Sequence, residues 1–252
     1  MSAYNRERYV AAAVRSVLAQ TRGDFELIVR DDGSTDGTLA AIRAAVGDDP
    51  RVRIMAGENL GVVGSLNLAA AEARGRYFGW VDSDDSLAPT ALEETARVLD
   101  GEPSVGMVYT SYVVIDEAGK MVGAGKRCKI PYTPQRLLVE FMTFHFRLMR
   151  KDFFDRVGRL DPTMIHAEDY DLCLKLSEVT EFRHVDKPLY AYRVHADSIS
   201  QERRVQQILA SRDAINAALR RRRMDATHEL QVQIVGRFQI RKKASSGNQA
   251  PA

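Results

Sequence analysis

Helical and strand patterns alternate through the first 85 residues, and this order constrains the fold more than any other feature. Apolar residues from Val10 to Leu18 recur at helical spacing, with Asn5 as the expected N-cap. Apolar runs at 25–30, 51–55 and 77–81 are typical of strands, and helices are expected at 39–46 and 65–73. This alternation predicts an α/β domain with a mixed, mostly parallel sheet flanked by helices, and a ligand site at the carboxyl ends of its strands.

Three carboxylates lie on one short turn directly after the strand at 77–81, in the sequence ValAspSerAspAsp at 81–85. Hard divalent cations such as Mg²⁺ and Mn²⁺ take oxygen ligands, commonly one or two carboxylates together with substrate phosphates. The turn therefore predicts a metal-bridged phosphate site. The alternative is a polar turn that only caps the following helix.

A second acidic loop, AspAspGlySerThrAspGlyThr at 31–38, follows the strand at 25–30. Its spacing resembles the start of an EF-hand, but the position that needs a bidentate Glu is Arg43, and a strand precedes the loop. A nucleotide site explains both loops better. Asp32 can accept a hydrogen bond from the N3–H of a uracil ring, Asp85 can hold the metal, and Asp84 remains for the ribose or a metal-bound water.

Composition excludes several classes of function. The chain has 36 Lys and Arg against 34 Asp and Glu, a net charge of +2, so its overall charge does not favour nucleic acid as a partner. Cys128 and Cys173 lack the spacing of a zinc site or a disulfide framework, which fits a reducing cytoplasm. No apolar run reaches about 18 residues, so we expect a chain that is at most peripheral to a membrane.

The second half of the chain is predicted to be a less regular α+β region. Helices are expected from Thr133 and Glu168, with a strand at 144–149 between them. We expect a catalytic domain at 1–200, divided into a nucleotide-binding half at 1–115 and an acceptor half at 116–200. A helical extension at 201–243 and a disordered tail at 244–252 follow.

A set of motifs in fixed order resembles glycosyltransferase family 2. It comprises TyrAsn at 4–5, SerValLeuAlaGlnThr, the acidic loop at 31–38, GluAsnLeuGlyVal, AlaArgGlyArgTyr, the acidic turn at 81–85, GluAspTyrAspLeuCysLeuLysLeu at 168–176 and TyrArgValHis at 192–195. The resemblance covers roughly residues 1–200. It implies the nucleotide-diphospho-sugar transferase (GT-A) fold, Mn²⁺ or Mg²⁺ as cofactor, and usually an inverting transfer from a UDP-sugar to a hydroxyl of a saccharide or lipid-linked acceptor.

The resemblance also assigns roles to residues. It places Ser2, Tyr4 and Asp32 around the nucleobase, Asp84 at the ribose, and Asp85 on the metal, with Asp82 and His195 as further candidates there. Asp169 would be the catalytic base that takes the acceptor proton. The alternative for Asp169 is a first-turn acid that stabilises a helix amino terminus. The alternative for His195 is a purely structural role.

Two further segments have alternative interpretations. The aromatic cluster at 141–146 stacks on an acceptor sugar or belongs to the core, and His145 and His166 are placed only loosely on the acceptor side. The basic run at 220–223 contacts an anionic membrane or is a solvated helix end.

The chain departs from the family at its start, because the family normally has an apolar strand of about five residues before TyrAsn. We therefore expect the first strand to be missing, leaving exposed strand edges and a groove in the core, and we expect upstream codons for such a strand in the native gene.

The sequence leaves two alternative functions open. A sugar-nucleotide nucleotidylyltransferase needs a glycine-rich basic loop that is not seen, and intact Asp85 and Asp169 argue against a catalytically inactive nucleotide-sugar-binding module.

Overall fold

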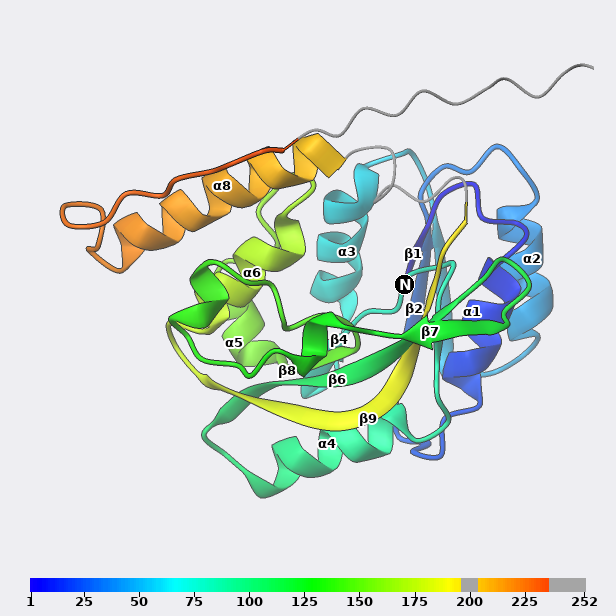
Figure 1. Cartoon of the computed structure of the whole chain (residues 1–252). Coiled ribbons are helices and arrows are strands. Elements are labelled where there is room, and N and C mark those ends of the chain that lie inside the picture. The colour runs from blue at the N-terminus through cyan, green and yellow to red at the C-terminus, as the bar shows by residue number, and fades with distance from the viewer. Residues whose placement is uncertain (196–203, 236–252) are drawn as a thin grey trace, which may run out of the picture.

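A computed structural model describes residues 1–195 and 204–235. The tail predicted at 244–252 lies outside this part of the chain. Strands form two sheets with helices packed against them, so the predicted α/β class is confirmed (Figure 1).

The first sheet is parallel and has the order β1-β2-β3, formed by Ser2–Ala3, Leu27–Asp31 and Val52–Ala56. Helices α1 (Val10–Leu18) and α2 (Thr38–Val46) pack together beside it, and α3 (Gly61–Glu72) contacts β1 and β2 from the other side (Figure 1). Every residue of β2 is buried, as expected for an interior parallel strand. The alternation of the amino-terminal half thus appears as predicted.

The second sheet has the order β4-β8-β6-β9-β5, formed by Tyr77–Gly79, Arg147–Arg150, Val105–Ile115, Glu181–Arg193 and Ser86–Leu87, and β7 (Met121–Ala124) pairs with β6. Only β6 and β9 are parallel, and the other pairs are antiparallel. The first sheet is therefore wholly parallel, and the second is mixed, with its longest ladder the parallel pair of β6 and β9.

Helices cover both sides of this sheet. Helix α4 (Ala91–Gly101) packs on β6, β8 and β9, while α5 (Lys151–Arg156), α6 (Glu168–Leu176) and α8 (Arg204–Arg221) lie on the opposite side (Figure 1). Short 3₁₀ turns occupy Arg127–Lys129 and Arg136–Leu138. No helix in the described ranges is long and apolar enough to cross a bilayer.

Three predicted element boundaries are wrong. Helix α1 begins at Val10 because Asn5 instead binds the loop after β2, accepting from the Thr35 amide at 2.9 Å. The helix expected from Thr133 is only the turn at Arg136–Leu138, and the strand expected from Phe144 begins at Arg147. At Asn5, a tertiary contact overrides local propensity.

A groove of about 440 Å³ separates the two sheets between β2 and β4, and its lining includes Leu27, Ile28, Phe78 and Leu148. In the described chain no strand pairs across it. The expected groove is present, but β2 beside it is fully buried, and the expectation of no strand before Tyr4 is corrected by the two-residue β1. The Met1 amino group is buried there, where it donates to the Ile28 carbonyl at 2.9 Å, and burial lowers its pKa to about 6.

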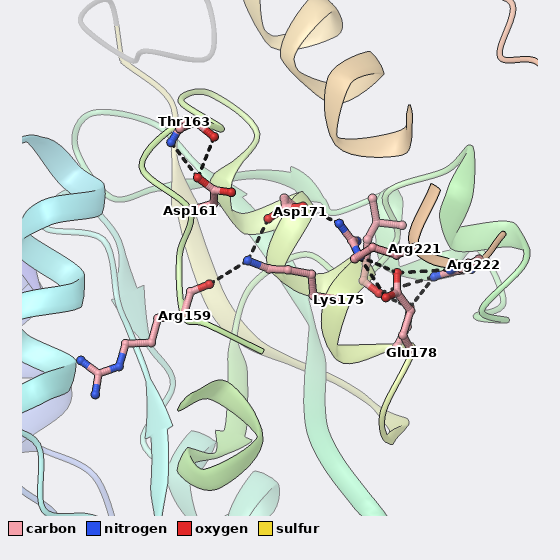
Figure 2. A network of polar contacts seen from close by, with 10 residues as sticks. Arg159, Asp161, Thr163, Asp171, Lys175, Glu178, Arg221 and Arg222 are labelled. Carbon is pink, nitrogen blue, oxygen red and sulfur yellow. Dashed lines mark hydrogen bonds and ion pairs between the residues drawn. The ribbon is translucent and has the colours of Figure 1, made fainter. Parts of the chain in front are cut away.

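A network of ion pairs joins α8 to α6 (Figure 2). Asp171, with 1 % of its surface exposed, pairs with Lys175 at 3.0 Å and with Arg221 at 3.6 Å. Glu178 pairs with Arg221 at 3.0 Å and with Arg222 at 3.4 Å. Beside these pairs, α8 buries four residues, Ala214, Ile215, Ala218 and Leu219, in the same core cluster as the buried side of α6. The network therefore holds the helix that begins at Glu168.

Candidate active site

The acidic turn after β4 is anchored most firmly at Asp85. The Asp85 carboxylate is 1 % exposed; it accepts from the Tyr190 hydroxyl and from the Arg193 amide, both at 2.7 Å. Burial, followed by the charges of Asp82 and Asp84, raises the pKa of Asp85 well above its usual value. Strand β9 thus anchors the turn through Tyr190 and Arg193.

Asp84 is held by three basic side chains. Its Oδ2 lies 3.0 Å from His195 Nε2 and 3.4 Å from Arg6 Nε, and its backbone carbonyl accepts from Arg193 Nε at 2.6 Å. Arg6 also donates to the Tyr4 carbonyl at 3.4 Å, so the segment after β1 lies against the acidic turn. His195 is buried against the Tyr9 ring, with ring centroids 4.9 Å apart.

Asp82 faces the carboxyl-terminal half of the protein. Its Oδ2 lies 3.4 Å from His145 Nε2, and 37 % of its side chain is exposed. Desolvation of the carboxylate within the site, followed by the nearby charge of Asp84, raises its pKa to about 7. His145 stacks on the Tyr190 ring, and burial together with the charge of Arg147 lowers the His145 pKa well below its usual value.

The predicted nucleobase residues gather where β1 and β2 end. Asp32 is 2 % exposed, and its Oδ1 accepts from the Leu60 amide at 2.8 Å and from Ser65 Oγ at 2.6 Å. The Asp32 amide donates to the Ala3 carbonyl at 2.8 Å, which brings Asp32 beside Ser2 and Tyr4. Tyr4 is 46 % exposed and Ser2 is half-buried.

Asp169 lies in the first turn of α6, as predicted, with 26 % of its side chain exposed. Its Oδ2 accepts from Arg147 Nη2 at 3.0 Å, and the same guanidinium nitrogen lies 3.4 Å from His145 Nδ1. A continuous line of contacts therefore runs from Asp82 through His145 and Arg147 to Asp169. It joins two acidic motifs that are 87 positions apart in the sequence.

The side chains suit a hard divalent cation in their chemistry. Asp82 and Asp85 are oxygen donors whose raised pKa values reflect burial and mutual repulsion, which a divalent cation would relieve. Within residues 1–195 and 204–235, however, no three His, Cys, Asp or Glu side chains gather around one point, and His195 contacts Asp84. The ligand set of Asp85, Asp82 and His195 stays a prediction.

Several residues of this site were not predicted from the sequence. Arg6, Arg147 and Tyr190 contact the acidic residues, but each comes from a segment without a recognisable motif. Arg193 lies within the TyrArgValHis motif, which was the one available signal for it. His145, placed only loosely by the sequence, contacts Asp82 directly.

Comparison with known proteins identifies the family. The sequence profile described as Glycosyl transferase family 2 matches residues 1–158, which is more than half of the chain. The chain belongs to glycosyl transferase family 2. The resemblance read from the motifs is thereby confirmed.

Curated relatives in family 2 include polysaccharide synthases. The chain is 35 % identical to a chondroitin synthase of Escherichia coli over 79 % of its own length and 29 % of the relative's. It is 34 % identical to a hyaluronan synthase of Pasteurella multocida over 79 % of its own length and 20 % of the relative's. The chain thus spans between a fifth and under a third of the length of these relatives.

Solved structures confirm the GT-A fold. TarS of S. aureus in complex with UDP-GlcNAc has a TM-score of 0.69 at 20 % identity, covering 86 % of this chain and 64 % of that one. The mannosyltransferase PcManGT of Pyrobaculum calidifontis, in complex with GDP-Man and Mn²⁺, has a TM-score of 0.64 at 18 % identity, covering 91 % and 74 %.

Proposed function

We propose that this protein transfers a sugar from a nucleotide-diphospho-sugar, with UDP-sugars as the first choice, to a hydroxyl of a saccharide or lipid-linked acceptor, with inversion at the anomeric carbon. The observation that carries the proposal is the line of contacts from Asp82 through His145 and Arg147 to Asp169. It brings the acidic turn of the donor side next to a carboxylate that suits a general base.

On the donor side, Ser2, Tyr4 and Asp32 would hold the nucleobase and Asp84 the ribose. Asp32 is supported by the neighbouring Leu60 amide and Ser65 hydroxyl, so its carboxylate is already oriented before the donor binds. Asp85, with Asp82 and His195, would hold Mn²⁺ or Mg²⁺, which when bound neutralises charge on the departing diphosphate.

On the acceptor side, Asp169 would take the proton of the attacking hydroxyl. The acceptor oxygen forms a bond to the anomeric carbon, and the bond from that carbon to the diphosphate oxygen breaks. Its electron pair leaves with the nucleoside diphosphate, and the proton ends on the Asp169 carboxylate. Attack from the side opposite the diphosphate gives inversion.

The chain would act in the cytoplasm, because both cysteines are buried free thiols. Peripheral membrane contact would involve Arg220 and Arg223, since Arg221 and Arg222 already pair with Glu178. Cosedimentation with vesicles containing anionic lipid tests this contact, and neutral vesicles serve as the control.

A donor panel tests the proposed activity. The protein is incubated with UDP- and GDP-sugars, with oligosaccharides of hyaluronan and chondroitin, and with Mn²⁺, Mg²⁺ or EDTA. Released nucleotide and the anomeric configuration of the product are then measured. We expect metal-dependent release that falls at least about 100-fold in Asp85→Ala and Asp169→Asn, whereas Asp48→Asn, at an exposed turn, behaves as wild type. Normal turnover by Asp169→Asn would exclude Asp169 as the base.

A further inference from the structure

Arg147, at the start of β8, is among the largest fully buried side chains in the described chain and is 1 % exposed. A guanidinium stays charged in a protein, so burying one is costly unless partners compensate it. The position of those partners indicates what Arg147 does.

The partners of Arg147 hold its guanidinium in one orientation. Nη1 donates to the Thr143 carbonyl at 3.2 Å, and the group lies 5.1 Å from the Trp80 ring centroid and 5.6 Å from that of Phe141. The one ion pair that Arg147 forms in residues 1–195 and 204–235 is with Asp169. The cation is therefore rigid and is directed at the proposed base.

The contact uses only one of the two Asp169 oxygens. Arg147 Nη2 donates to Oδ2 at 3.0 Å, whereas Oδ1 accepts no hydrogen bond from the described residues, and the side chain is partly exposed. We propose that Arg147 is a positioning residue: it fixes Asp169 through Oδ2, so that Oδ1 is the oxygen that takes the acceptor proton. This inference rests on the proposed function, in which Asp169 is the base.

Arg147 is also the cation that keeps neighbouring carboxylates together. Glu168 and Asp82 lie near enough to Asp169 to interact with it electrostatically, and His145, beside Arg147, is neutral because burial lowers its pKa. The Cys173 thiol, 3.7 Å from Nη1, adds no cation. Without Arg147, no cation would offset the repulsion among these carboxylates, and Asp169 would lose the contact that orients its carboxylate.

Three variants test the proposal. Arg147→Met removes the charge with little loss of volume, Arg147→Lys retains a charge without the planar fork, and Arg150→Met is the matched control. Arg150 lies on the same strand and is also buried, but it donates only to the Val105, Leu99 and Glu102 carbonyls. Thermal unfolding is measured for all three variants.

For Arg147→Met we expect kcat to fall about 100-fold, while the KM for the donor changes less than about threefold. The acid limb of kcat/KM should move upward by about one pH unit or more. Arg147→Lys should restore the wild-type acid limb and recover about tenfold in kcat. Arg150→Met should lower the unfolding temperature without moving the acid limb.

A carboxyl-¹³C NMR titration of Asp169, in wild type and Arg147→Met, gives a readout independent of turnover. An upward shift of its midpoint in the variant supports the proposal. If the midpoint and the acid limb stay in place and Arg147→Met behaves like Arg150→Met, the role is purely structural and the proposal is overturned. If the wild type releases no nucleotide from any donor, the proposed function fails, and the NMR result alone decides whether Arg147 controls Asp169.

Discussion

Asp32 combines two tasks in one residue, because it supports the segment before α3 and lies at the predicted nucleobase site. In Asp32→Ala, the Leu60 amide and the buried Ser65 hydroxyl lose their acceptor, which we expect to cost about 1–3 kcal/mol. Asp32→Asn retains an amide oxygen that can accept both bonds, so its stability should stay within about 1 kcal/mol of wild type. Its NH₂ group cannot accept from a nucleobase N–H, so donor affinity should still fall about tenfold.

Urea unfolding and calorimetric titration with UDP separate the two tasks of Asp32. Ser65→Ala is the control, since it removes one supporting hydroxyl without changing the carboxylate. Wild-type affinity for UDP in Asp32→Asn would remove Asp32 from the nucleobase site.

Glu168 gives a prediction about pH. Burial, followed by the charge of Asp169, raises its pKa from 4.5 to about 7. The folded protein therefore binds this proton more tightly than the unfolded chain, and the unfavourable contribution of Glu168 to stability grows as pH rises from 4.5 to about 7. The Glu168→Gln variant lacks this unfavourable contribution. Its free energy of unfolding relative to wild type should therefore rise by on the order of 1–2 kcal/mol between pH 4.5 and pH 8. Urea unfolding at pH 4.5, 6 and 8 measures this gain, with exposed Glu229→Gln as control, and an equal difference at all three pH values would contradict it.

Some residues of the candidate site could be predicted from the sequence and others could not. The positions of Asp32, Asp82, Asp84, Asp85 and Asp169 followed from where strands end and α6 begins, which local patterns reveal. Arg147 and Arg6 were not predicted, because a long side chain reaches its partner only after distant segments have packed. The spacing of apolar residues along the sequence does not predict contacts of this kind.

At the scale of elements, the pairing of α6 with α8 depends on a buried charge. Asp171→Ala removes the carboxylate shared by Lys175 and Arg221. Arg221 keeps its pair with Glu178 and Lys175 still donates to the Arg159 carbonyl, so we expect the loss to cost about 1–3 kcal/mol. Arg221→Ala should cost less, since Lys175 still pairs with Asp171 at 3.0 Å. Equilibrium urea unfolding compares both with Arg212→Ala, which breaks an exposed pair with Asp213. Equal losses in Asp171→Ala and Arg212→Ala would show that the network is not stabilising.

Elements differ in how well the sequence predicted them. Helix α6 begins at Glu168 as predicted, because three acids in its first turn and its apolar spacing agree. Helix α1 begins four residues later than predicted, with Tyr9 as N-cap in place of Asn5, because Asn5 has a positive φ of 51° and binds Thr35 in the loop after β2. Local sequence patterns therefore predicted the start of α6 correctly, whereas at α1 a contact with a residue distant in the sequence changed the start of the helix.

At the scale of the whole molecule, helix α8 shares one hydrophobic core cluster with helix α6. A chain ending at residue 203 loses the buried surface of Ile215 and Leu219, along with Ala214 and Ala218. We expect its free energy of unfolding to be lower by roughly 5 kcal/mol than that of a chain ending at residue 228. Guanidinium unfolding of both chains measures the difference. Identical midpoints would mean that α8 is a dispensable extension.

The groove between β2 and β4 has a consequence for cooperativity. Backbone hydrogen bonds form continuous ladders within each sheet, but none links β2 to β4. Asp32 belongs to one side of this break and Asp169 to the other. Amide hydrogen exchange should therefore divide the protein into two separately opening units, and a nucleotide that spans the break would raise the protection of both together.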